Sequence, residues 1–473
     1  MSSGLLRLLC IIPMKRSLDS PRYWENKWGR RTDMSKKSIV IVGGGLTGAL
    51  AALALSRDGH KVSVYERRGD IRDARIVHGR SINLAISTRG LTALERVGLR
   101  EHALEMAVPM RGRRMHGKDS TTTFQPYSPN ADDNIYSISR GGLNKFLIEK
   151  AAEEKEVELH FQQRCIGVDA RAGVVRFEHE DTGEIVEVNG DLVIGADGAY
   201  SAVRQNLMVG DRFNYSQDYL THGYTELYIP PAEDGEFRIE KNALHIWPRG
   251  KFMMIALPNG DGSFTGTLFW PLEGENSFSQ LKDPSQVKRY FEEWFPDVPA
   301  LVPDLEEQYL ASSPSSLVTI RCKPWVVGKI ALVGDSAHAI VPFYGQGMNA
   351  GFEDVRILCE RIESNPEDLD QALVEYQEER IVNGNAIADL ALQNFYEMQD
   401  HVAKPLFLLS KKFSNLLQKC LPGWYRSLYS MVSFSNTPYA DAISISKSQE
   451  KTIRFVVVLV VAIVVMAFLW SLK

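Results

Sequence analysis

The sequence of 473 residues has few cysteines and no large excess of either charge. Its five cysteines, Cys10, Cys165, Cys322, Cys359 and Cys420, are odd in number and widely spaced. This pattern argues against a disulfide framework and a zinc site and favours a reducing compartment. The formal net charge is −5, so bulk charge favours neither nucleic acid nor an anionic surface as a partner. The composition is that of a globular protein long enough for two or three domains.

Residues 1–37 contain a poor match to a secretory signal, and Pro21–Arg31 shows no helical or strand period. The short apolar run Leu5–Ile12 is interrupted by Arg7 and followed by Lys15 and Arg16, whereas a secretory signal carries its basic residues before the apolar core. We expect these residues to form a disordered extension, with a role in targeting as the alternative.

The strongest motif lies near the start of the globular part. Ile39–Val42 predicts a buried parallel strand. Gly43, Gly45 and Gly48 follow at G-x-G-x-x-G spacing before a predicted helix, and a second strand ends at Glu66. In this context the motif predicts dinucleotide binding, because the glycines allow a tight turn, backbone approach to a pyrophosphate and close helix packing. An ordinary turn between strand and helix is the alternative. The sequence contains no second motif of this kind.

Two later stretches also place a buried strand before a turn and a helix. Leu192–Ile194 predicts a strand that precedes the turn Gly195–Gly198. Ile330–Val333 predicts another, which ends near Asp335, and Gly345–Asn349 then leads into a helix. Such turns can place a carboxylate and backbone N–H groups beside a bound nucleotide; for Gly195–Gly198 an ordinary turn is the alternative.

The region between these two stretches changes to strand alternation. Phe213–Phe269 predicts an antiparallel sheet whose aromatic residues suit the wall of an apolar pocket or a plain sheet core. Farther along, Leu373–Lys412 predicts an amphipathic helix, Pro422–Ser435 another helix, and Asp441–Glu450 a polar linker.

The sequence ends in an apolar run, Phe455–Trp470, which has sixteen residues and no charge. As a helix this run is about 24 Å long, whereas the hydrocarbon core of a bilayer is roughly 30 Å thick. Flanking residues lengthen the helix, and local thinning of the bilayer can close the remaining gap. Lys447, Lys451 and Arg454 precede the run. We expect a membrane anchor with the body on the basic, cytosolic side; a buried strand or core helix is the alternative.

The three strand–turn–helix stretches, in this order, resemble the FAD-dependent aromatic hydroxylases with the para-hydroxybenzoate hydroxylase fold. The late segment GDSAHAIVPFYGQGMNAGFED, Gly334–Asp354, is highly specific for that family. Within the family, the chain resembles the kynurenine 3-monooxygenases over Ser38–Lys473. The motifs that carry this resemblance are RSINLA at Arg80–Ala85, PMRGR at Pro109–Arg113, HGY at His222–Tyr224, LHIWPR at Leu244–Arg249, FMMIALPN at Phe252–Asn259 and LYSMVSFS at Leu428–Ser435.

The resemblance implies an α/β fold, with a Rossmann-like FAD-binding domain, an inserted antiparallel-sheet substrate domain, a C-terminal helical region and a C-terminal transmembrane helix. We expect the FAD-binding domain at residues 38–210 and 320–370 and the substrate domain at residues 211–319. Residues 371–440 would close the substrate site, and residues 441–473 would form the linker and anchor.

The resemblance also implies site residues. Arg113 and Tyr127 match the carboxylate-binding pair of the family, together with Asn394 and Tyr429. A guanidinium fork and a phenol suit an amino-acid substrate. No side chain is expected to act as an acid–base catalyst or to bind a metal. The implied FAD-binding residues are Gly43, Gly45, Thr47, Gly48, Tyr65, Glu66, Arg67, Arg68, Ala85, Arg140, Cys165, Ala202, Asp335, Met348 and Asn349.

The activity implied by the resemblance is hydroxylation of L-kynurenine to 3-hydroxy-L-kynurenine, a step of tryptophan catabolism toward NAD biosynthesis. FAD would stay bound, NADPH would bind transiently, and O₂ would supply the oxygen through a flavin hydroperoxide. The implied location is the mitochondrial outer membrane, with the catalytic body facing the cytosol and no nucleic-acid partner. One alternative is a membrane-tethered flavin hydroxylase or epoxidase of another aromatic or lipid substrate; the other is a non-catalytic tethered flavoprotein.

Overall fold

The computed structural model describes residues 36–73, 83–398, 413–414 and 416–471. The extension expected at residues 1–37 therefore lies almost wholly outside the described residues. So does the part of the predicted Leu373–Lys412 helix that follows residue 398.

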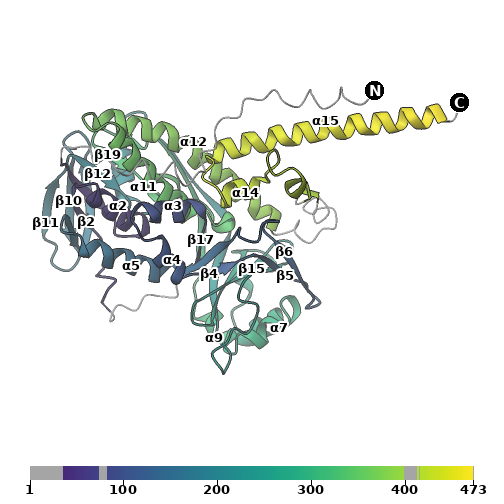
Figure 1. Cartoon of the computed structure of the whole chain (residues 1–473). Coiled ribbons are helices and arrows are strands. Elements are labelled where there is room, and N and C mark those ends of the chain that lie inside the picture. Colours follow the sequence, from purple (N-terminus) through teal and green to yellow (C-terminus); the bar gives the residue numbers. More distant parts are fainter. Residues whose placement is uncertain (1–35, 74–82, 399–412, 415, 472–473) are drawn as a thin grey trace. The chain divides into compact units, whose positions relative to one another are not determined.

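A six-stranded sheet with the order β18-β19-β12-β1-β2-β8 carries the glycine motif (Figure 1). All neighbouring strands are parallel except β18 and β19. Its central strand β1 is buried from Ile39 to Val42, as expected for a β-branched run in a covered parallel sheet. The strands are β1 (Ser38–Val42), β2 (Lys61–Tyr65), β8 (Val157–His160), β12 (Leu192–Gly195), β18 (Val326–Val327) and β19 (Ile330–Leu332).

Helices pack around this sheet. The chain between β1 and β2 forms α2, which is rich in Ala and Leu and buried from Gly48 to Ser56. It contacts α5 and α11, and α11 also contacts α3 and α12. The helices are α2 (Leu46–Arg57), α3 (Thr88–Arg96), α4 (Arg100–Glu105), α5 (Arg140–Glu153), α6 (Ala202–Leu207), α10 (Asp335–His338), α11 (Gly347–Ser364) and α12 (Leu369–Tyr396).

Two small antiparallel sheets extend this part of the protein. One has the order β3-β7-β4, with β3 at Asn83–Ile86, β7 at Ile135–Ser139 and β4 at Val108–Met110. The other has the order β11-β10-β9, with β9 at Gln163–Asp169, β10 at Val174–His179 and β11 at Ile185–Asn189.

A seven-stranded sheet forms the second large layer, in the order β17-β13-β16-β15-β14-β5-β6. Its strands are β5 (Gly112–His116), β6 (Thr122–Pro126), β13 (Asn214–Ile229), β14 (Leu244–Pro248), β15 (Met253–Pro258), β16 (Phe264–Pro271) and β17 (Ser315–Lys323). The sheet is thus larger than the expected 211–319 domain and not wholly antiparallel, because β5 pairs in parallel with β14. This pairing brings the segment with Arg113 into the seven-stranded sheet.

The two faces of this sheet have separate cores. One face packs against η1 (Phe278–Gln280), α7 (Pro284–Trp294), α8 (Val298–Leu301) and α9 (Leu305–Leu310) around buried aromatic residues such as Trp247, Trp270 and Phe291. The other face packs against η2 (Pro342–Tyr344) and the end of α12, through residues that include Phe269 and Phe395. This second face points toward the site described below.

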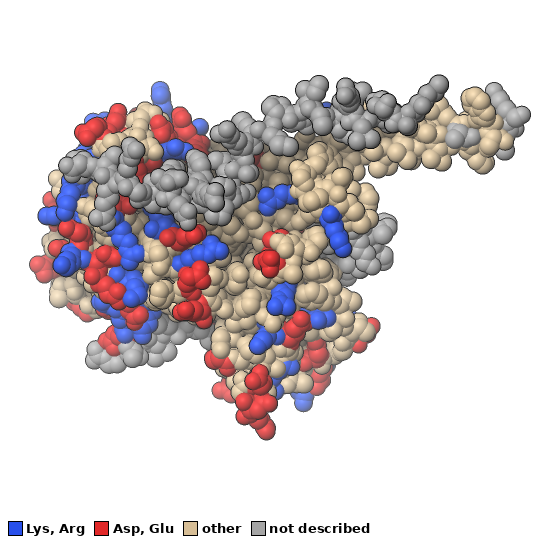
Figure 2. All heavy atoms as spheres, viewed as in Figure 1, with Lys and Arg blue, Asp and Glu red and all other residues tan. Residues whose placement is uncertain are grey.

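The C-terminal region ends in a long helix. It contains α14 (Leu428–Ser433), shorter than the expected Pro422–Ser435 helix, and α15 (Tyr439–Ser471). Residues 441–450, expected as a linker, form the first turns of α15, because no Gly or Pro interrupts them. The 33-residue α15 is long and apolar enough to cross a membrane, and none of its most apolar stretch is buried. In Figure 2 its outer part shows no acidic or basic side chains.

Candidate active site

One cavity of about 980 Å³ joins the end of β1 to the second face of the seven-stranded sheet. Of the predicted site residues, Gly48, Asn349 and Asn394 do not line it. The predicted residues that do line it are Gly43, Gly45, Thr47, Tyr65, Glu66, Arg67, Arg68, Ala85, Arg113, Tyr127, Arg140, Cys165, Ala202, Asp335, Met348 and Tyr429.

The glycine motif has the geometry that a dinucleotide phosphate requires. Gly43 has a φ of 103°, and a Cβ there would lie 2.6 Å from the carbonyl oxygen of Ala196. A Cβ at Gly48 would lie 1.9 Å from the carbonyl oxygen of Gly43, so this glycine allows α2 to pack closely. A Cβ at Gly45 would meet nothing within 4 Å and would take up space in the cavity. The first turn of α2 has no acidic residue and no side-chain cap, so its N–H groups suit an anion.

Glu66 lies just beyond the end of β2, at the edge of the glycine turn. Its Oε2 accepts a hydrogen bond from the backbone N–H of Gly44 at 2.7 Å, and its Oε1 accepts from the Nε of Arg68 at 2.8 Å. Burial raises the pKa of Glu66, but Arg68 and the backbone N–H groups outweigh it and hold the pKa below its usual value. The ionised carboxylate can therefore accept hydrogen bonds from ribose hydroxyls.

Asp335 and Met348 line the cavity after the late strand β19. Enclosure raises the pKa of the Asp335 carboxyl group, although Arg140 and His338 oppose this effect. Met348 belongs to the first turn of α11, whose N-terminus has no side-chain cap. The dipole of this 18-residue helix favours negative charge at that end of the cavity.

Asn349 lies behind this wall rather than in it. Its Nδ2 donates to the carbonyl oxygens of Ala85 and Gly345, both at 2.8 Å, and its Oδ1 accepts from the backbone N–H of Ser87 at 2.9 Å. The side chain is fully buried. Asn349 therefore positions two residues that line the cavity, Ala85 and Gly345, and both N–H groups of its side-chain amide are occupied by these hydrogen bonds.

A cluster of one cation and two phenols occupies the other end of the cavity. The rings of Tyr127 and Tyr429 are stacked with centroids 5.2 Å apart, and the Arg113 guanidinium carbon lies 5.3 Å from the Tyr429 centroid and 5.8 Å from that of Tyr127. Arg113 is buried; burial lowers the pKa of its guanidinium, and Tyr429, Tyr127 and Glu397 more than reverse this. Arg113 Nε has no hydrogen-bond partner among the described residues, and the Tyr127 hydroxyl lies beside Arg113 and Tyr429. The cluster can therefore bind an anionic group.

Apolar and aromatic residues line the same cavity beside this cluster. Leu244, Ile255 and Phe269 of the seven-stranded sheet line the cavity. Sequence reasoning missed Tyr344, whose ring lies 5.7 Å from that of Tyr429; its place directly before the GQGMN segment was the available indication.

Asn394 supports the aromatic wall from behind. Its Nδ2 donates to the carbonyl oxygen of Phe343 at 2.6 Å, and the residue is buried. Phe343 lines the cavity, so Asn394 fixes the wall without facing the cavity itself.

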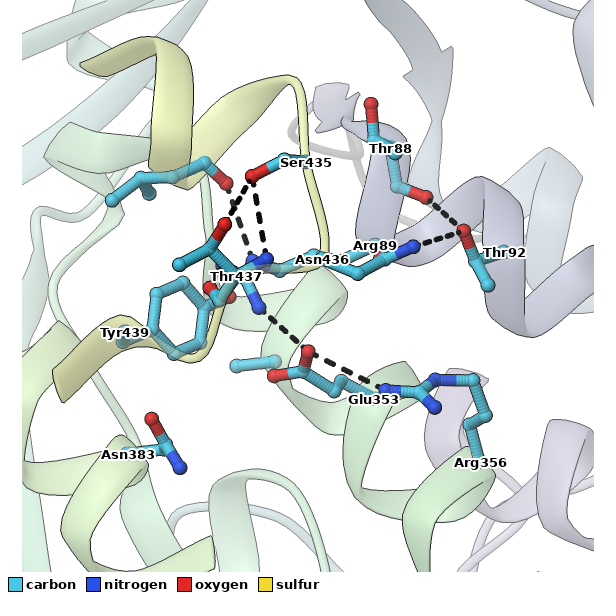
Figure 3. Close-up of polar contacts among 12 residues, drawn as sticks. Thr88, Arg89, Thr92, Glu353, Arg356, Asn383, Ser435, Asn436, Thr437 and Tyr439 are labelled. Carbon is cyan, nitrogen blue, oxygen red and sulfur yellow. Dashed lines mark hydrogen bonds and ion pairs between the residues drawn. The ribbon is translucent and has the colours of Figure 1, made fainter. Parts of the chain in front are cut away.

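A buried ionic network, also missed from the sequence, holds the C-terminal region against the cofactor domain (Figure 3). Arg89 Nη1 lies 2.6 Å from Glu353 Oε1 and Arg380 Nη1 lies 2.7 Å from Glu353 Oε2. Arg89 also donates to the carbonyl oxygens of Val432 and Thr437 and lies 3.9 Å from the centroid of the Tyr439 ring. The segment that carries Tyr429 and begins α15 is thus attached to α3 and α11.

Comparisons with known proteins agree with this geometry. The family described as FAD binding domain matches residues 36–391. Proteins named kynurenine 3-monooxygenase are similar over most of the chain. That of Dictyostelium discoideum is 44% identical over 431 residues, 88% of this chain and 92% of the relative. That of Anopheles gambiae is 42% identical over 416 residues, 87% of this chain and 85% of the relative.

Solved structures share the fold at lower identity. The tetrameric form of 2-methyl-3-hydroxypyridine-5-carboxylic acid oxygenase has a TM-score of 0.64 and 19% identity, covering 81% of this chain and 98% of that one. A tetracycline destructase has a TM-score of 0.59 and 19% identity, covering 85% of this chain and all of the other. The fold is that of the FAD-binding aromatic hydroxylases, and the chain belongs to the kynurenine 3-monooxygenase family.

Proposed function

We propose that this protein hydroxylates L-kynurenine to 3-hydroxy-L-kynurenine, with consumption of NADPH, a proton and O₂ and release of NADP⁺ and water. The observation that carries the proposal is the single cavity, which joins a phosphate-binding glycine turn to a buried Arg113–Tyr127–Tyr429 cluster. The names of the similar proteins support this choice of substrate.

The residues at the cofactor end fit FAD. The N–H groups of α2 would hold its pyrophosphate, Glu66 its ribose, and Asp335 and Arg140 the linking part of the molecule. When bound, FAD supplies the transfer of hydride from NADPH and the activation of O₂. The N-terminus of α11 would favour negative charge on the bound ring system through its dipole.

The residues at the other end fit an aromatic amino acid. Arg113 would bind the carboxylate through paired N–H donors, and Tyr127 and Tyr429 would add hydroxyl donors. Leu244, Ile255 and Phe269 would pack against the aromatic ring and exclude water from it. The chain thus orients the ring and keeps the reaction site dry, and no side chain is required as a general base.

Substrate-dependent NADPH oxidation tests this function. We expect the purified protein to be yellow and to oxidise NADPH far faster when L-kynurenine is present, with 3-hydroxy-L-kynurenine formed in step with the NADPH consumed. A matched set of other aromatic acids and of lipids tests the alternative hydroxylase or epoxidase. Colourless protein, or oxidation that does not respond to L-kynurenine, would contradict the proposal.

We also propose that α15 anchors the protein in the mitochondrial outer membrane with the catalytic body in the cytosol. The helix is apolar and fully exposed over its outer part. Lys447, Lys451 and Arg454 lie just before the apolar run, which favours the cytosol for that side.

Deletion of Phe455–Lys473 tests the anchor. We expect the full chain to sediment with mitochondria and the deletion variant to remain soluble, because the variant loses the whole apolar run. Protease added outside intact mitochondria should digest the body of the full chain. Sedimentation of the deletion variant with membranes would contradict the anchor, and protection from protease would contradict the orientation.

A further inference from the structure

Within the part of the chain that the structure describes, an exposed apolar face lies between the active site and the start of α15. Residues 413–414 and 416–420 are helical, so Phe413, Leu416 and Cys420, at i, i+3 and i+7, share one side. Leu421 and Trp424 follow directly after the helical residues. Leu416 is 57% exposed, and Phe413, Leu421 and Trp424 are exposed as well. We name as the docking face the residues Phe413, Leu416, Cys420, Leu421 and Trp424.

The opposite side of the same segment is fixed to the body of the protein. The hydroxyl groups of Ser414 and Tyr425 lie 2.8 Å apart. Gln418 Oε1 accepts from the backbone N–H of Ser427 at 3.1 Å, and its Nε2 donates to Ser430 Oγ at 3.2 Å. These contacts hold the segment with its polar side inward, so the apolar side is presented to the surroundings.

The docking face lies at the depth where a bilayer surface would be. Gln449 of α15 donates from Nε2 to the carbonyl oxygen of Trp424 at 2.9 Å. Phe455, the first residue of the apolar run, follows six residues later, which is about 9 Å along the helix. This distance is comparable to the thickness of one headgroup layer. Trp side chains favour this layer.

The charges around the docking face also suit a bilayer surface. Lys419 is exposed beside it, and Lys447 and Lys451 lie on the adjoining part of α15. Arg454 is 3.5 Å from Glu450 and is largely exposed. An apolar helix side bordered by basic residues is typical of segments that lie in the plane of an anionic membrane surface.

We infer that the docking face inserts into the headgroup layer of the membrane that α15 crosses, at a surface that contains anionic phospholipids. The inference rests on the proposed anchor and adds a second, in-plane contact to it. The body is then fixed in one orientation relative to the bilayer rather than free to rotate about α15. Gln418 also lies 3.4 Å from Ser128 Oγ, so the docked segment adjoins the residues next to Tyr127 and Tyr429.

Cys420 allows a direct test in the full chain, because it is an exposed cysteine on the docking face. Burial raises the pKa of Cys165 and that of Cys322 to about 12, and it also raises the pKa of Cys359. A thiol-specific nitroxide should therefore label Cys420 selectively once Cys10 is replaced by Ser. The labelled protein would be reconstituted into vesicles of phosphatidylcholine and phosphatidylserine. Flotation reports the anchor, and the accessibility of the label to O₂ and to a water-soluble nickel complex reports its depth.

The control carries the label at Thr182→Cys, in the exposed turn between β10 and β11, with Cys420→Ser. We expect both proteins to float, and the ratio of O₂ to nickel accessibility to be severalfold higher at position 420 than at position 182. Flotation with equal ratios would overturn the docking face and leave the anchor. Absence of flotation would overturn both. A label at position 420 that is shielded from both reagents already in detergent would show that a second copy of the chain covers the face, and would also overturn the inference.

Discussion

Replacement of Arg113 by Met is expected to raise the KM for L-kynurenine by about 10- to 150-fold while FAD remains bound. The reason is the loss of a charged hydrogen bond to the substrate carboxylate, worth about 1.5–3 kcal/mol. Arg113 lies at the end of the cavity lined by Tyr127 and Tyr429, whereas the glycine turn lies at the other end. Steady-state kinetics measure the KM for L-kynurenine, and the flavin absorbance spectrum of the purified variant shows whether FAD is still bound.

Arg114 provides a matched control on the same strand. Successive residues of β5 point to opposite faces, and Arg114 Nε lies 2.7 Å from Glu240 Oε2 near the surface. Arg114→Met should therefore leave the KM unchanged. Arg113→Lys should recover part of the affinity, because an ammonium group keeps the charge but cannot form the paired hydrogen bonds of a guanidinium. An unchanged KM in Arg113→Met would remove this residue from the substrate site.

The cofactor end of the site was predictable because its requirements are local. Strand β1, the turn at Gly43 and helix α2 follow one another in sequence, and Gly43 and Gly48 each have a steric reason that follows from their place in the motif. The late segment likewise places Asp335 and Met348 at the cavity. In both cases a short stretch of sequence determines the path of the backbone and which of its atoms face the cavity.

The substrate end could not be derived from local pattern. Arg113 and Tyr429 meet because β5 pairs in parallel with β14 and because α14 packs beside it, and no periodicity within either segment encodes that contact. Only the family resemblance indicated these residues. The same limit explains Asn349 and Asn394, which the resemblance implied as site residues but whose amides hydrogen-bond to the backbone behind the cavity wall.

Charged residues in helices gave the least information before the structure. Arg89, Glu353 and Arg380 lie on α3, α11 and α12 and are all buried. A charge in a helical segment usually indicates a solvated face, and the network becomes visible only when the three helices are packed together. Because the network is buried, removal of one of its charges should strongly lower the stability of the folded protein.

Replacement of Glu353 by Gln is expected to destabilise the protein by about 3–5 kcal/mol, since it removes the acid from a buried ionic group and leaves cations behind. Glu353 is paired with both Arg89 and Arg380, and all three side chains are at most 3% exposed. Arg380 keeps Asp354 at 2.7 Å, but among the described residues Arg89 keeps only carbonyl oxygens and the Tyr439 ring. Thermal unfolding followed by flavin fluorescence measures the loss. The control is Arg356→Gln, because Arg356 is 3.7 Å from Glu353 and 12% exposed.

The pH dependence of the stability difference between wild type and Glu353→Gln tests whether the ionised carboxylate of Glu353 is its cause. Burial raises the pKa of Glu353, but Arg89, Arg380 and Arg356 outweigh it and hold the pKa below its usual value. A carboxyl group whose pKa is lower in the folded than in the unfolded state stabilises the folded state at pH values above its unfolded pKa of about 4.3. This stabilisation is lost as the pH falls through the folded-state pKa. The stability gap between wild type and Glu353→Gln should therefore be full at neutral pH and narrow in acid. A gap that stays constant down to the pH of acid unfolding would point to altered packing rather than to charge.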